Sequence, residues 1–146
     1  MSRQEISNMT FFVGVFLERE NNLPPKSLLE QERELVNSLL LPAVIIDITG
    51  TIQAWNAAAE KLLGYEMIDI VGRNINLIMT GEDKEKHDSY LKRYASTGKT
   101  KVIGRSRKVI TLSKKGEVLP INLFVSEKSE MDKKFFTGIL QPVPQN

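Results

Sequence analysis

The chain has 146 residues, of which 41% are hydrophobic and 26% are charged, as in one ordinary globular domain and unlike a disordered tail or a coiled coil. It contains no cysteine, which excludes disulfide scaffolds, thiolate metal sites and cysteine nucleophiles. The apolar stretch at residues 9–17 has about half the length of a membrane span. We therefore expect a cytoplasmic protein with no membrane partner.

The net charge of +2 conceals a strongly basic block at residues 84–108, which holds nine basic and two acidic side chains. Nucleic-acid binders usually add stacking aromatic residues or a recognition helix, and neither is clear here, so we do not expect nucleic acid as a partner. The block is then either a solvated helix face or a set of cations that attracts a small anionic ligand.

The first segment of the chain is set apart by the Pro24–Pro25 pair, which interrupts regular structure. Residues 1–25 are therefore predicted to be an N-terminal extension. Apolar residues then recur at helical spacing and predict an amphipathic helix within 26–41, which ends before Pro42. This helix either packs on its own domain or acts as a homodimer or signal-transmitting helix.

A β-hairpin is predicted next, because residues 43–48 and 51–56 are rich in β-branched and aromatic residues and a Thr-Gly turn separates them. Asn56 can cap a following helix over 57–65, which Gly64 ends. Trp55, on the second strand, is expected to be a structural residue.

Short helical turns are predicted at 67–70 and 75–79, and a turn role is enough to explain Asn74. Thr80 and Asp83 have the spacing of a capping box, which predicts a longer helix over 82–96.

Three strands are predicted in the last third of the chain, at about 101–112, 117–126 and 134–140. The middle strand alternates apolar and polar residues and so has one buried face. Two strands, a set of helices and three further strands predict an α+β fold, with a five-stranded antiparallel sheet, helices over one face, and a pocket between sheet and helices.

Several stretches together resemble a PAS sensory domain over residues 42–141, with 142–146 as a tail. They are IDITGTIQAWNAAAEKLLGY, VGRNINLIM, HDSYLKRYASTGKTKVIGRSRKV, KKGEVLPINLFVSE and FFTGIL. Within that family the chain is most similar to the haem-binding, oxygen-sensing FixL-type branch. The resemblance implies a sensory and signalling module that is not an enzyme.

The resemblance also implies roles for individual residues. His87 matches the histidine that ligates haem iron, and Arg93 matches an arginine that meets a haem propionate. Arg107 matches a strand arginine that binds propionate in one state and turns toward bound oxygen in another. Leu123 and Val125 match apolar positions of the pocket that face the iron.

The chemistry of the predicted helix agrees with these roles. Helical spacing places His87, Tyr90, Leu91 and Tyr94 on one side, so the chain's single histidine faces the apolar pocket. Haem b needs one axial ligand, an apolar wall and cations at its rim. The alternatives are flavin or another small ligand, and a ligand-free interaction or dimerisation module in which His87 is a core residue.

The expected partners are an adjacent PAS or output domain of a larger signalling protein and a second copy bound through the N-terminal helix. Residues 11–16, FFVGVF, resemble residues 135–140, FFTGIL, at a separation of about one PAS unit. The N-terminal extension is then either the last strand of a preceding PAS repeat or a segment that pairs with a sheet edge.

Overall fold

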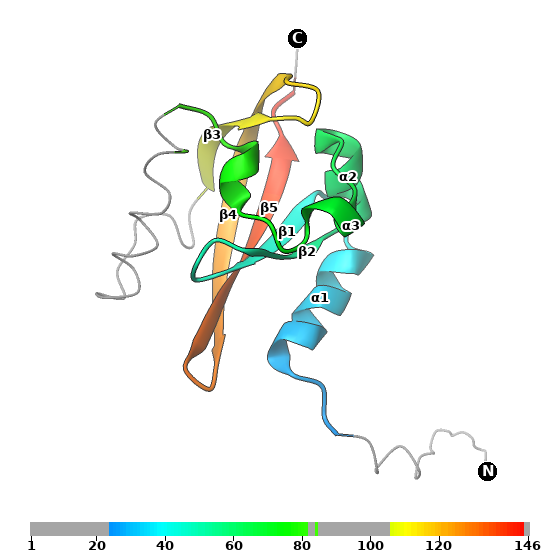
Figure 1. Cartoon of the computed structure of the whole chain (residues 1–146), viewed down its shortest axis with the longest axis vertical. Helices are drawn as coiled ribbons and strands as arrows, with labels where there is room; N and C mark the ends of the chain where they lie inside the picture. Colours follow the sequence, from blue (N-terminus) through cyan, green and yellow to red (C-terminus); the bar gives the residue numbers. More distant parts are fainter. Residues whose placement is uncertain (1–23, 82–83, 85–105, 145–146) are drawn as a thin grey trace, which may run out of the picture.

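The sheet has five antiparallel strands in the order β2-β1-β5-β4-β3. A computed structural model describes residues 24–81, 84 and 106–144. It confirms the predicted α+β architecture (Figure 1). The elements are α1 (Leu28–Ser38), β1 (Ala43–Asp47), β2 (Ile52–Trp55), α2 (Ala57–Leu63), α3 (Met67–Ile70), η2 (Ile75–Ile78), β3 (Ser106–Leu112), β4 (Val118–Glu130) and β5 (Lys133–Pro142).

Some of the predicted elements lie in parts of the chain that the structure does not describe. The helix over 82–96, the first part of the strand over 101–112 and the repeated FFVGVF stretch lie outside the described residues. Among the helices that are described, none is long and apolar enough to cross a membrane.

One face of the sheet, the inner face, packs against the helices that follow β2. Alternation along β4 directs Leu119, Ile121, Leu123 and Val125 to this face, as predicted, because successive side chains of a strand point to opposite sides. They meet buried apolar residues of α2, α3 and η2, and the resulting core contains Trp55, Ala59, Leu63, Ile70, Ile75, Ile78 and Ile121.

The opposite, outer face of the sheet is partly covered by α1. A second cluster of buried residues joins the helix to β1, β2 and β5; it comprises Val36, Ala43, Ile45, Ala54 and Phe135. The helix begins with a capping box in which Ser27 and Glu30 exchange hydrogen bonds, and the bonds from Ser27 lower the pKa of the Glu30 carboxyl. The apolar stripe of α1 thus packs against the sheet of its own domain.

A buried polar contact also links α1 to the sheet. Glu32 is 7% exposed, and its carboxylate accepts a hydrogen bond of 2.7 Å from the Thr137 hydroxyl of β5. The Lys128 ammonium lies 3.4 Å from the other carboxylate oxygen. At the start of the helix, the Leu28 amide donates to Glu130 of β4. Because a buried carboxylate is costly without partners, these contacts fix where α1 lies.

Asn56 connects three segments through one buried side chain. Its Oδ1 accepts hydrogen bonds from the amides of Ala43 and Ala59, at 3.0 and 2.9 Å. Its Nδ2 donates to the carbonyls of Val36 and Leu41, at 3.0 and 2.8 Å. The predicted cap of α2 is confirmed, and the same carboxamide also holds the end of α1 and the start of β1.

The hairpin of β4 and β5 is longer than predicted. Its strands continue to a turn at Met131 and Asp132, whose φ angles of 52° and 68° are left-handed. The prediction ended early because this turn lacks the Asn-Gly or Asp-Gly sequence typical of such hairpins. The tip lies at the same end of the domain as the start of α1 (Figure 1).

Replacing Asn56 with Ala should lower the free energy of unfolding by about 3 kcal/mol, because a buried side chain loses four hydrogen bonds to the backbone. Asn74→Ala is the matched control, since Asn74 caps η2 from an exposed position and should cost about 1 kcal/mol. Urea unfolding of both variants measures the difference. Equal losses would contradict the central role of Asn56.

Replacing Thr137 with Val should cost about 2 kcal/mol, because a buried carboxylate loses a hydrogen-bond donor. Thr49→Val removes a hydroxyl that donates to a carboxylate at an exposed site, and should cost less than about 0.5 kcal/mol. Urea unfolding gives both values, and amide hydrogen exchange in α1 should accelerate only in Thr137→Val. Unchanged exchange in α1 would show that this contact does not hold the helix.

Candidate functional site

Three of the predicted site residues lie on the inner face of the sheet. Arg107 of β3 pairs in register with Leu123 of β4, and Leu123 pairs with Leu140 of β5. Val125 follows two positions after Leu123 and therefore points to the same side. Leu123 and Val125 are both partly buried against the inner core. The structure thus brings Arg107, Leu123 and Val125 to one surface.

The middle of this surface is lined by residues from three neighbouring strands. Gly138 of β5 lies between Val125 on one side and Val44 of β1 on the other. Phe136 and Leu140 lie two positions before and after Gly138 along β5, and both are buried. The result is an apolar floor with a glycine near its centre.

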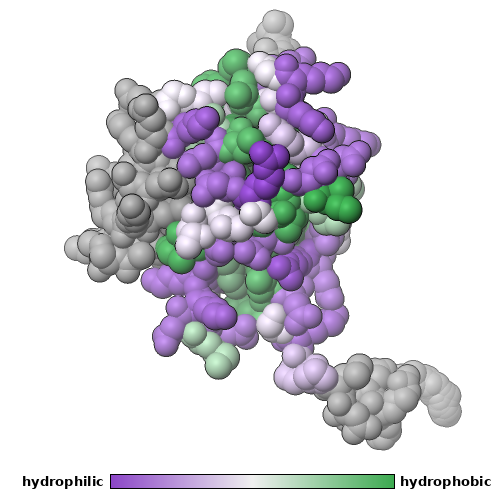
Figure 2. Space-filling model, viewed as in Figure 1, coloured by the Kyte–Doolittle hydropathy of each residue, from purple (hydrophilic) through white to green (hydrophobic). Residues whose placement is uncertain are grey.

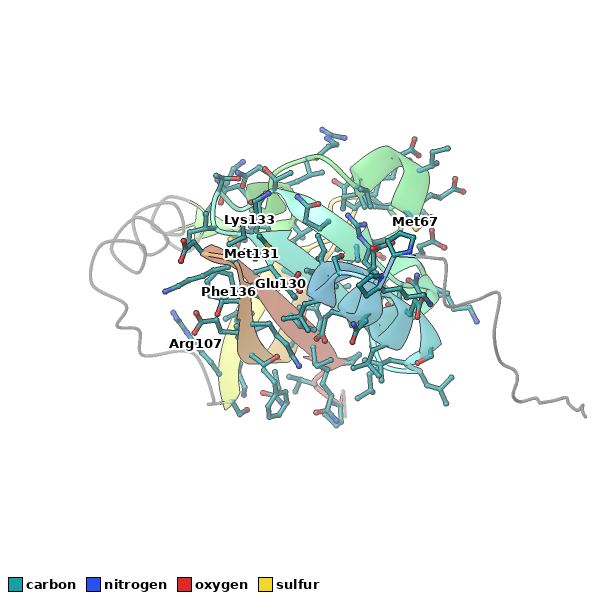
Figure 3. All side chains as sticks on the ribbon, turned by 90° about the horizontal axis from the view of Figure 1, so that it is seen from below. Met67, Arg107, Glu130, Met131, Lys133 and Phe136 are labelled. Carbon is teal, nitrogen blue, oxygen red and sulfur yellow. The ribbon has the colours of Figure 1, made fainter. Side chains whose placement is uncertain are left out.

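Charged groups stand at the margin of the floor rather than within it. Arg107 is half-buried near the start of β3, where that strand pairs with β4. Glu127 follows Val125 on the same side of β4, and its carboxylate lies 3.7 Å from the Lys134 ammonium. Figure 3 places Arg107 on the opposite side of the domain from Met67 of α3. The arginine therefore offers a cation at one edge of an apolar surface.

An apolar surface with an arginine at its edge can contact apolar groups and pair with anionic ones. Burial of apolar ligand area drives binding, and the guanidinium can pair with carboxylate or phosphate oxygens. Within the described part of the chain, no cluster of three or more histidine, cysteine or acidic side chains is placed to hold a metal ion. His87, Tyr90 and Arg93 lie outside the described residues, so their roles stay predictions.

Two other residues singled out in the sequence are structural, as expected. Trp55 is 1% exposed, and its indole nitrogen donates to the carbonyl of Tyr65 at 2.8 Å. Asn74 accepts a hydrogen bond from the Asn76 amide and so begins η2.

Sequence reasoning missed Gly138 as a residue of the inner face. The signal was present in FFTGIL, because alternation places its glycine on the same side as the second phenylalanine and the leucine. A glycine inside a strand often marks close approach of another group.

Comparison with known proteins agrees with this architecture. A family profile described as the PAS fold matches residues 30–143. The sensor protein FixL of Bradyrhizobium diazoefficiens is 28% identical over 99% of the chain, and the oxygen sensor protein DosP of Escherichia coli is 26% identical over 70%. The chain spans only 29% and 13% of the lengths of these two relatives.

Solved structures show the same fold at lower identity. The PAS domain of an HTR-like protein from Haloarcula marismortui has a TM-score of 0.62 and is 18% identical, covering 78% of this chain and 90% of that domain. A LOV protein from Rhodobacter sphaeroides has a TM-score of 0.60 and is 14% identical, covering 80% of this chain and 67% of that one.

Proposed function

Because the chain belongs to the PAS family, whose domains are sensory modules, we propose that it is the sensor part of a larger signalling protein and binds haem b through His87. Oxygen or another diatomic gas is the proposed signal. The observation that carries the proposal is the placement of Arg107, Leu123 and Val125 on one surface. The residues around His87 resemble the haem-binding branch of the family, and one relative is named an oxygen sensor.

Each residue has a physical task in this proposal. Haem would supply the iron that binds the gas. His87 would hold the iron through a neutral imidazole nitrogen, with Tyr90 on the same predicted helix face. Leu123 and Val125 would exclude water from the opposite side. Arg93 and Arg107 would pair with the propionates, and the Arg107 guanidinium would also be able to turn and donate hydrogen bonds to a polar gas molecule in the pocket.

The partners follow from the relatives. Both are several times longer than this chain, so an adjacent PAS or output domain in the cytoplasm is the proposed recipient of the signal. A homodimer through the N-terminal helix is also proposed. Since the apolar stripe of α1 packs on its own sheet, such a dimer would rest on the exposed part of the helix surface, where Leu35 is 53% exposed.

Flavin is the alternative ligand, because LOV proteins share this fold. A flavin also has a flat ring and, as its mononucleotide, an anionic phosphate that Arg107 would attract. The chain has no cysteine, so flavin would be held without a covalent cysteinyl bond.

A ligand-free interaction module is the second candidate function. Met67, Ile68 and Val71 are exposed at and just beyond α3, and Ile68 is 83% exposed. Figure 2 shows hydrophobic surface in this region. Contiguous exposed apolar residues are typical of protein contacts. In this case His87 would be a core residue, and the purified protein would stay colourless when haem is supplied.

Replacing His87 with Ala should abolish the ligation-dependent absorption band and weaken haem binding at least about tenfold, because the iron loses its axial ligand. The experiment is a titration of the purified chain with haemin, followed by spectra before and after dithionite. Parallel titration with flavin mononucleotide tests the alternative ligand. An unchanged spectrum in His87→Ala would contradict the assignment, and a wild-type chain that binds neither would favour the interaction module.

Replacing Arg107 with Leu should weaken haem binding about threefold and reduce its dependence on salt, because a propionate loses a cation. Lys108→Leu is the matched control, since Lys108 is the next residue of β3 and is exposed on the outer face. Haemin titrations at low and high salt compare the two variants. Equal effects would contradict a specific role for Arg107.

A further inference from the structure

The outer face of the sheet is covered by α1 on one side of β5 and carries exposed apolar residues on the other side. The helix packs on β1, β2 and β5, whereas β4 and β3 lie beyond β5 (Figure 3). Phe124 of β4 is 41% exposed and Ile110 of β3 is 37% exposed. We call this outer surface of β3 and β4 the bare half; it comprises Lys108, Ile110, Val118, Pro120, Asn122 and Phe124.

The bare half is continuous with the core beneath α1. Phe124 pairs in register with Ile139 of β5, and Ile139 pairs with Ala43 of β1. Ala43 is buried under the helix, and Ile139 packs against the same cluster. The apolar surface therefore extends from beneath α1 to the exposed ring of Phe124. Exposed apolar surface of this kind is typical of a contact with another protein surface.

Leu35 lies on the side of α1 that is turned toward the bare half. It follows three positions after Glu32, so the two side chains share a side of the helix, and Glu32 contacts β5 and β4. Arg33, on the other side, donates a hydrogen bond to the carbonyl of Gln53 in β2. Leu35 is 53% exposed and therefore adds an apolar side chain beside the bare half.

The hydrogen bonds at the end of α1 also fix the level of Leu35 along the sheet. The carbonyl of Val36, the next residue, accepts a hydrogen bond from the Asn56 side chain, which in turn accepts one from the Ala43 amide. Ala43 belongs to the same cross-strand row as Phe124. Leu35 and Phe124 therefore lie at about the same level, on the helix and on the bare half respectively.

Charge and shape both suit a second copy of this chain as the partner. The helix exposes Glu30 and Glu34, of which Glu34 pairs with the exposed Lys26, and the charged member of the bare half is Lys108. Opposite charges favour the helix of one copy over the bare half of another. Because α1 rises above the sheet beside the bare half, the face is a ridge next to a step, which is complementary to itself under a twofold rotation.

We propose that the outer face forms a twofold homodimer in which α1 of each copy lies across the bare half of the other. The inference deepens the homodimer of the proposed function and rests on it, but it does not depend on haem. A twofold axis along the line between α1 and β4 keeps residues at their level on the sheet. Leu35 of one copy then contacts Phe124 of the other, while Val36 stays packed on its own sheet.

Sedimentation velocity over a concentration series measures the dissociation constant of the dimer. Phe124→Ala should raise this constant at least about tenfold and Ile110→Ala about threefold, because both remove apolar contact from the interface. Ile68→Ala makes the same truncation at α3, the other exposed apolar patch, and should leave the constant unchanged. Urea unfolding of each variant shows that it is folded, since all three side chains are exposed in the single chain.

Cross-linking tests the predicted contact directly, because the chain contains no cysteine of its own. An equal mixture of Leu35→Cys and Phe124→Cys chains, oxidised with copper phenanthroline, should form a disulfide-linked dimer, since the two positions face each other across the interface. The matched control is a mixture of Leu35→Cys and Ile68→Cys chains, which should stay unlinked.

The outcomes separate the inference from the proposed function. A dimer that Phe124→Ala leaves unchanged, or that Ile68→Ala weakens instead, would overturn the inference and place the homodimer on another surface. Absence of the link between Leu35→Cys and Phe124→Cys chains would overturn it too. A wild-type chain that is monomeric at every concentration would overturn both the homodimer and the inference, whereas haem binding is decided separately by the haemin titration.

Discussion

The carboxamide of Asn56 is the contact on which the arrangement of the domain depends. Four hydrogen bonds from one buried side chain join the end of α1, the first residue of β1 and the first turn of α2. The amides of Ala43 and Ala59 in particular find their acceptor in this one buried side chain. Because α1 lies on the outer face and α2 on the inner face, Asn56 sets both layers relative to the sheet.

Strand β5 carries side chains that take part in the contacts of both faces of the sheet. Phe136, Gly138 and Leu140 point to the inner face, and the residues between them point to the outer face. Thr137 donates to Glu32 of α1, and it stands in sequence directly beside Gly138, whose backbone underlies Leu123. The inner floor and the contact that holds α1 are therefore adjacent along a single strand, β5.

Local chemistry allowed much of the fold to be predicted. Asn56 begins α2 by side-chain capping and Gly64 ends it with a left-handed φ of 84°, both of which are properties of residue type. The alternation of β4 predicted that Leu123 and Val125 share the apolar face, whereas Arg107 was assigned to the site by the family resemblance and pairs with Leu123 in the folded sheet. These features depend on residues that are neighbours along the chain, so the amino-acid sequence alone was enough to predict them.

Other features depend on segments that meet only after folding. The bond between Glu32 and Thr137 joins residues 105 positions apart, so the amphipathic pattern of α1 could not say which surface it would cover. The second pair of hydrogen bonds from Asn56 is of the same kind, because its acceptors belong to another helix end and a loop. Gly138 could be placed on a face from alternation, whereas its closeness to Leu123 needed the packed sheet.

The proposed ligand binds the inner face of the sheet, whereas α1 covers the outer face. Methyl NMR tests this separation most directly. The measurement compares the wild-type chain alone with the chain bound to zinc protoporphyrin, a diamagnetic analogue of haem. Ring currents fall off steeply with distance, so methyl groups of Leu123, Val125 and Leu140 on the inner face should shift strongly. The methyl groups of Val36 of α1 and of Ile45 beneath that helix should shift little. Equal shifts on both faces, or shifts confined to the methyl groups under α1, would contradict the account.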